Sequence, residues 1–215
     1  MPIFLLFVIL FAMWIRYEIK KNSQIESENK TSFIERERQA NFARKADITN
    51  LDYVSVPLAS LPFSGSYDEV ESSYKLPSDI DAGMKSEILA CEKNVIALSQ
   101  KKILNLNGLS NTDIKMQYGV ANLQILIQYD ENFSKLSRTL AKWGKLLFDN
   151  GELTASEKVL SYSVTCKSDI EDVFITLAKI YHQTGNELGI SDLIQSCDCF
   201  DELRRENIIH QITSV

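Results

Sequence analysis

The sequence contains little glycine and little proline, and its prolines stop before the middle of the chain. Of its 215 residues only 8 are Gly and 4 are Pro, and the last proline is Pro77. Proline interrupts helices, so its absence from the C-terminal part favours long uninterrupted helices there. The spacing of apolar residues described below has the period of helices as well. We therefore predict an all-α fold.

Residue patterns that would indicate catalysis or metal binding are also missing. The sequence has no G-x-S-x-G turn, no phosphate-binding glycine loop and no H-E-x-x-H motif, and its two histidines, His182 and His210, fall on different predicted helices. The cysteines are Cys91, Cys166, Cys197 and Cys199. Their spacing matches neither a disulfide framework nor a structural zinc site. We expect reduced cysteines and no catalytic, cofactor-binding or metal-binding residues.

Excess positive charge is lacking too. The formal net charge is −6, whereas non-specific nucleic-acid binding requires clustered Lys and Arg, so we expect no nucleic-acid partner. With 45% hydrophobic residues the chain can fill the core of one modest domain with appendages.

The N-terminus is apolar and is followed by basic residues. The first 15 residues carry no charged side chain, and Arg16 and Lys20 follow, with Trp14 and Tyr17 at the junction. A helix of about 15–19 residues spans roughly 22–29 Å, close to the hydrocarbon core of about 30 Å, and snorkelling side chains can cover the difference. Residues 1–19 are therefore predicted to be a single-pass transmembrane anchor in the cell membrane.

A cleaved signal peptide is the alternative interpretation of this segment. It would carry a basic residue before the apolar run and small residues at its end, whereas this run ends in the bulky Met13, Trp14 and Ile15. The basic residues after the run, including Lys21, favour a cytoplasmic body, with the extracellular side as the alternative.

Three further regions follow from composition. Residues 20–46 are highly charged and predict a juxtamembrane helix whose alternating Glu and Arg residues at 35–38 face solvent. Residues 47–81 contain Pro57 and Pro62 among apolar residues and then an acidic stretch. This predicts an extended segment packed across a helical body, followed by a linker from residue 64 to residue 81.

Residues 82–215 have helical periodicity. Helices are expected over 82–100 and from 111 onward, with closing helices over 187–196 and 199–212. Whether residues 113–149 form one bent helix or two is left open, because Tyr129–Asn132 can either break the helix or kink it.

An internal repeat lies between Ser137 and Cys197. With a shift of about 34 residues, the two halves align their apolar and glycine positions, a period typical of helix–turn–helix repeats. The aligned pairs are Leu140 with Phe174, Trp143 with Leu177, Gly144 with Ala178, Leu147 with Tyr181, Gly151 with Gly185, and Leu160 with Ile194. Gly144 is expected where two helices approach closely, and Gly151 where a helix ends.

These residues resemble the tetratricopeptide repeat family, in which an aromatic or leucine pair precedes a small residue and a glycine follows seven residues later. The second helices depart from that pattern, with Ser156, Ser163, Ile190 and Cys197 at positions usually held by small residues. Together with the segments ANFARKADITNLDY and GLSNTDIKMQYGVANLQILIQYDENF, the chain also resembles uncharacterised membrane-anchored proteins of Gram-positive bacteria. An ordinary antiparallel helix bundle would produce similar apolar spacing.

The resemblance implies a peptide groove on the first helices of the repeats. When the family's groove positions are mapped onto this chain by aligning Gly144 and Ala178, they fall on Arg138, Ala141, Lys145, Phe148, Asp172, Ile175, Lys179 and His182. The basic members would favour a carboxylate of a protein or peptide partner. The function expected is that of a membrane-anchored, non-catalytic scaffold or adaptor. The alternatives are an accessory or sensor subunit of a membrane complex, a structural bundle packed against another membrane protein, and a membrane-bound enzyme with a site around His182; the oligomeric state is left open.

Overall fold

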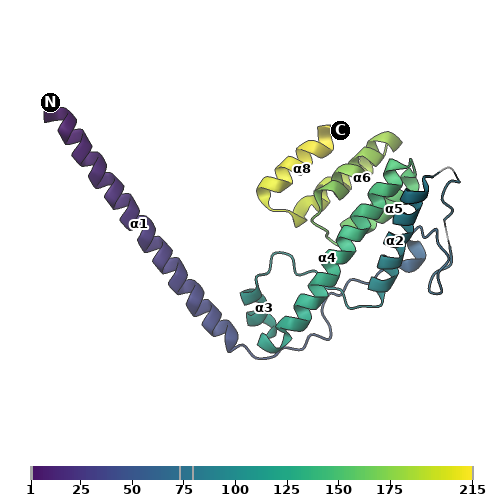
Figure 1. The fold of residues 1–215 in the computed structure, drawn as a ribbon, viewed down its shortest axis with the longest axis horizontal. Coiled ribbons are helices and arrows are strands. Elements are labelled where there is room, and N and C mark those ends of the chain that lie inside the picture. The colour runs from purple at the N-terminus through teal and green to yellow at the C-terminus, as the bar shows by residue number, and fades with distance from the viewer. Residues whose placement is uncertain (1, 73, 79, 215) are drawn as a thin grey trace. The chain divides into compact units, whose positions relative to one another are not determined.

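The fold is built from helices. A computed structural model of the chain describes residues 2–72, 74–78 and 80–214, except for the side chains of Pro2, Ile3, Leu5, Leu6, Val8, Ile9 and Ala12. Its elements are α1 (Pro2–Asn41), η1 (Leu58–Ser60), α2 (Ala82–Ser99), α3 (Asn111–Tyr118), α4 (Val120–Asp149), α5 (Leu153–Thr165), α6 (Glu171–Thr184), α7 (Glu187–Gln195), η2 (Ser196–Cys199) and α8 (Glu202–Ser214) (Figure 1). Within the described residues the only β pairing consists of two isolated bridges. The predicted all-α class is confirmed.

The chain divides into two compact units. The first comprises residues 1–49 and 108–124, and the second comprises residues 50–107 and 125–215. The helix α4 contributes its first turn to the first unit and its remainder to the second.

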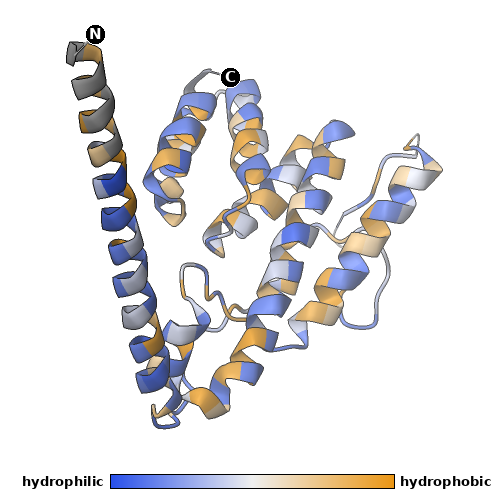
Figure 2. Cartoon of the chain, turned by 60° about the vertical axis from the view of Figure 1, so that its left-hand side comes forward, coloured by the Kyte–Doolittle hydropathy of each residue, from blue (hydrophilic) through white to orange (hydrophobic). Residues whose placement is uncertain are grey.

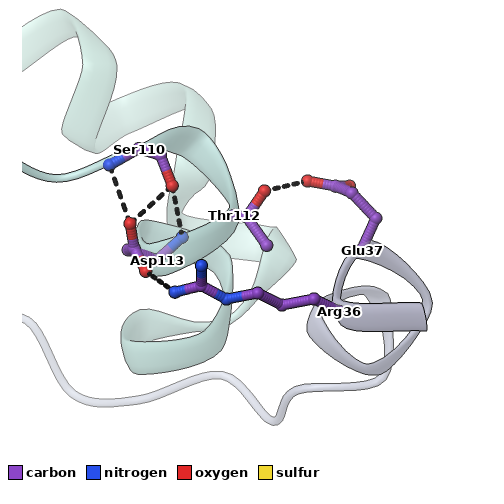
Figure 3. Close-up of polar contacts among 5 residues, drawn as sticks. All are labelled: Arg36, Glu37, Ser110, Thr112 and Asp113. Carbon is purple, nitrogen blue, oxygen red and sulfur yellow. Dashed lines mark hydrogen bonds and ion pairs between the residues drawn. The ribbon is translucent and has the colours of Figure 1, made fainter. Parts of the chain in front are cut away.

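In the first unit, a group of polar contacts, which we call the clamp, joins the end of α1 to α3 (Figure 3). Arg36 pairs with Asp113, and the carboxylate of Glu37 accepts hydrogen bonds from the hydroxyl of Thr112 and from Lys115 Nζ, the latter at 2.7 Å. Asp113 also completes a capping box with Ser110 at the start of α3. Near the end of α1, Ala40 is fully buried.

Gly119 separates α3 from α4. Residues 113–149, which the sequence left open, therefore belong to two helices, and the second runs unbroken through Tyr129–Asn132. Gly119 has φ +84°, and a Cβ at this position would lie 2.6 Å from the carbonyl oxygen of Arg44. Asn122 Nδ2 donates to the carbonyl oxygens of Ala46 (2.8 Å) and Tyr118 (2.7 Å). The chain leaving α1 is therefore held against the α3–α4 junction.

In the second unit, the first core surrounds Trp143 of α4. Its indole is fully buried, with the ring of Phe63 5.3 Å away between centroids. The other buried side chains come from α2, α4, α5 and the segments on either side of α2, and they include Leu61, Ile88, Val95, Ile103, Phe133, Leu136, Leu140, Leu147, Ala155 and Val159. The proline-containing stretch thus contributes to the core.

Residues 54–72 and 74–76, which we call the strap, are held by a buried carboxylate. Glu92 of α2 is 0% exposed and accepts hydrogen bonds from Ser64 N (2.9 Å), Ser64 Oγ (2.7 Å), Gly65 N (2.9 Å) and Tyr67 Oη (2.8 Å). Burial and the neighbouring Glu92 raise the pKa of the Tyr67 hydroxyl, which stays a donor. The structure here differs from the expected linker over 64–81, because Tyr67, Val70 and Tyr74 pack against the first core.

The helices α4 and α5 form a tight hairpin. A Cβ at Gly144 would lie 2.5 Å from Leu160 Cγ, so the close approach expected at Gly144 is present. Ser156 Oγ donates to the Gly144 carbonyl oxygen at 2.7 Å across the same contact. Gly151, with φ +78°, makes the turn between the two helices.

The second core lies among α5, α6, α7 and α8. Phe174, Leu177 and Ala178 of α6 are buried in this core, and α6 packs against α5, α7 and α8. The ribbon shows α6 between α5 and α8 (Figure 1). Gly185 ends α6 in the left-handed conformation, with φ +69°. From α8, Ile208 and Ile212 enter this core, while Leu203 stays exposed.

The apolar segment of the sequence forms the start of α1, whose remainder is largely hydrophilic (Figure 2). The anchor predicted over residues 1–19 lies partly outside the described side chains. Among the residues that are described, no helix is both long enough and apolar enough to cross a membrane.

We predict that Gly144→Ala destabilises the second unit by about 1–3 kcal/mol, because the added methyl group overlaps Leu160. In a Leu160→Ala background the same substitution has space, and the higher helix propensity of alanine should make it neutral or stabilising. Urea unfolding of the four proteins of this double-mutant cycle measures the coupling. Strictly additive effects would show that the contact with Leu160 does not set the cost.

We also predict that the clamp weakens in acid. Hydrogen bonds from Lys115 and Thr112 lower the pKa of Glu37, and hydrogen bonds from Ser110, with the charge of Arg36, lower the pKa of Asp113. Since the folded-state pKa values lie below the ordinary range of about 4, the clamp contributes fully above that range and is lost as the pH falls through the lowered values.

Hydrogen-exchange protection factors of the α3 amides should therefore fall between pH 7 and pH 3. Glu37→Gln should reduce the protection already at pH 7, whereas Glu26→Gln, on the same helix and without a clamp partner, should not. Protection of α3 that does not change with pH would contradict the role of these carboxylates.

Candidate peptide-binding face

The predicted groove residues lie on α4 and α6, and the basic members are accessible. Arg138 and Lys145 of α4 and Lys179 of α6 are exposed, and within the described residues none of the three forms an ion pair. Lys142, a neighbour on α4, is instead paired with Glu87 of α2 at 2.7 Å. The charges of Arg138, Lys145 and Lys179 are therefore available to a ligand.

The apolar members of the predicted groove have a partly structural role. Phe148 and Ala141 of α4 are half-buried and pack against the second core, and Ile175 of α6 is half-buried as well. Ala141 and Phe148 lie four and three residues from Lys145, and Ile175 lies four residues from Lys179. Side chains at these spacings are neighbours on a helix surface, so this face offers both charge and apolar contact. Two helical turns separate Arg138 from Lys145, a rise of about 10 Å along α4.

His182 is engaged by the C-terminal helix. Its Nε2 lies 3.1 Å from the carbonyl oxygen of Ile212 in α8, and this contact links the end of α6 to the last turns of α8. The imidazole therefore has a partner within the chain. We therefore define the face available to a ligand by Arg138, Lys145, Phe148 and Lys179, without His182.

Two hollows lie away from this face. One of about 560 Å³ is bordered by the strap and the start of α5. Its lining includes Lys158 and also Tyr74, whose hydroxyl donates to Glu152. The other, of about 490 Å³, lies between the end of α5 and η2, and it is lined by Lys167, Asp198 and Cys199 among others. Neither includes a residue of the predicted groove.

The described residues contain no group of three or more His, Cys, Asp or Glu side chains arranged to hold a metal ion. The cysteines are free thiols; Cys91, Cys166 and Cys197 are buried, and Cys199 is half-exposed. Burial raises the pKa of all four thiols, and that of Cys199 rises to about 11. A raised pKa means little reactive thiolate at neutral pH.

Sequence reasoning missed two polar arrangements, the clamp and the buried Glu92. Arg36 and Glu37 were expected on a solvated helix face, but they contact α3. No spacing rule could have found these contacts, because the partners are 77 and 78 residues away.

Comparison with known protein families, with curated proteins and with solved structures finds no match to this chain. The resemblance to tetratricopeptide repeats thus stays a prediction, as do the partners and the membrane location.

Thiol alkylation of the folded protein should be slow at pH 8. We expect Cys199 to react first, since it is the most accessible, yet more slowly than a fully exposed thiol of ordinary pKa, because its own pKa is raised. Cys91, Cys166 and Cys197 should react only after unfolding. Mass spectrometry of digests after timed labelling measures the order, and rapid labelling of Cys166 in the native protein would contradict the buried positions.

Proposed function

We propose that this protein is a non-catalytic, membrane-tethered helical-repeat adaptor that binds an acidic protein segment across α4 and α6. The observation that carries the proposal is the repetition of a helical hairpin: α4 with α5, then α6 with α7, with glycine after the first helix of each. α8, whose outward face is mostly polar, follows as a terminal helix. Terminal elements of this kind end repeat arrays.

The ligand class follows from charge. Arg138, Lys145 and Lys179 are exposed cations with no ion pair to any described residue, on a chain whose net charge is negative. Guanidinium and ammonium groups form charge-assisted hydrogen bonds with carboxylates, and Phe148 supplies adjoining apolar surface. An acidic segment or a free C-terminus satisfies both features. Two repeats form a short face, so we expect micromolar affinity, about −8 kcal/mol.

The tether is proposed for α1. Its apolar residues precede basic ones, and Phe4, Phe7, Phe11 and Met13 are each more than half exposed. Exposed apolar side chains have a lower free energy in hydrocarbon than in water. With such a tether, the adaptor would hold its partner beside the membrane.

The charge-reversed variant Arg138→Glu/Lys145→Glu/Lys179→Glu tests the binding face. A displayed library of acidic and neutral peptides with free C-termini is selected on the wild-type protein, and the affinity of the selected peptides is measured by calorimetry. We expect acidic peptides to be enriched and their affinity to fall more than tenfold in the variant, about 1.4 kcal/mol or more.

The matched control is Lys85→Glu/Lys93→Glu/Lys158→Glu, which changes the net charge equally at exposed positions of α2 and α5. Circular dichroism of both variants verifies the fold. The proposal fails if no acidic peptide is enriched, or if the control weakens binding as much as the reversal on α4 and α6.

A further inference from the structure

The α1 helix carries a concentrated group of basic side chains directly after its apolar segment. Arg16, Lys20 and Lys21 are exposed, and within the described residues they form no ion pair. Between residues 16 and 25 they are accompanied by a single carboxylate, that of Glu18. We call Arg16, Lys20 and Lys21 the basic collar.

The later part of α1 has a different charge pattern. From residue 26 to its end, four glutamates are interspersed with three basic residues. Several of these charges are already matched, since Arg38 pairs with Glu35 and the clamp engages Arg36 and Glu37. The uncompensated positive charge of α1 is thus confined to the collar.

Aromatic side chains lie next to the collar. Trp14 and Tyr17 are 58% and 65% exposed, and the ring of Trp14 stacks on Phe11 with 6.0 Å between centroids. Tryptophan and tyrosine favour the boundary between hydrocarbon and headgroups. From Trp14 to Lys21 the helix rises about 10 Å, which is comparable with the thickness of one headgroup layer.

We infer that the basic collar binds the headgroups of anionic phospholipids, so that α1 selects negatively charged membrane surfaces. The inference rests on the membrane tether proposed above and adds a lipid class to it. The apolar residues before the collar supply affinity for any bilayer, whereas the ammonium and guanidinium groups supply the preference for negative charge. This preference decreases with ionic strength, because the charges are at the surface.

A competition between two vesicle populations tests the inference on the full chain. Vesicles of phosphatidylcholine alone and sucrose-loaded vesicles of phosphatidylcholine with phosphatidylglycerol are mixed in one sample and separated by density. We expect the protein to prefer the anionic vesicles on the order of 100-fold at low salt, since three basic residues act near the surface. In Arg16→Gln/Lys20→Gln/Lys21→Gln the preference should largely disappear, while binding to both populations persists.

The matched control is Lys75→Gln/Lys85→Gln/Lys93→Gln, which removes the same charge from exposed positions outside α1 and should keep the preference. Equal binding of the wild type to both populations overturns the lipid selectivity but leaves the tether intact, whereas absence from both overturns the tether as well. A control that loses the preference equally, or displacement by inorganic phosphate beyond that by chloride of equal ionic strength, also overturns the inference.

Discussion

Helices pack at a distance set by the side chains between them, and at Gly144 there is no side chain. Leu160 of α5 fills the space where a Cβ would stand, and Ser156 reaches the Gly144 carbonyl. This contact places α5 so that Ala155 and Val159 join the first core while Leu160 joins the second. The helices that carry the basic face, α4 and α6, are thus both positioned through α5. The clamp is independent of this contact, because it lies within the first unit.

Sequence periodicity was sufficient for α2 and α7. They begin and end within a few residues of the predicted ranges 82–100 and 187–196, and the side chains of Asp81 and Asn186 cap their first turns. Periodicity failed at the α3–α4 junction. There the decisive feature is the backbone approach of Arg44 to Gly119, a contact between residues distant in sequence. The acidic composition of residues 64–81 likewise suggested a linker, although Tyr67 and Tyr74 pack against the core.

The basic side chains of the candidate face could be placed from the repeat register, since a helical position determines which side chains point outward. Their lack of ion pairs with other described residues could not be predicted in this way. Lys142 has the same character in the sequence as Lys145, yet only Lys142 meets Glu87. The contact of His182 with α8 depends on how the last helix folds back, which no local pattern encodes. The sequence thus shows which side chains are charged, whereas the fold determines which of these charges are already paired within the chain.

The buried carboxylate of Glu92 has a consequence for the order of folding. Its four hydrogen-bond donors come from residues 64–67, so α2 cannot bury this group until the strap has arrived. Burying the carboxylate alone would carry a large desolvation penalty. Docking of α2 and docking of the strap are therefore one cooperative event, and a fragment that began at Ala82 would lack both Phe63 and the donors. The strap, whose composition suggests a dispensable linker, is therefore required for the helices of the second unit to fold together.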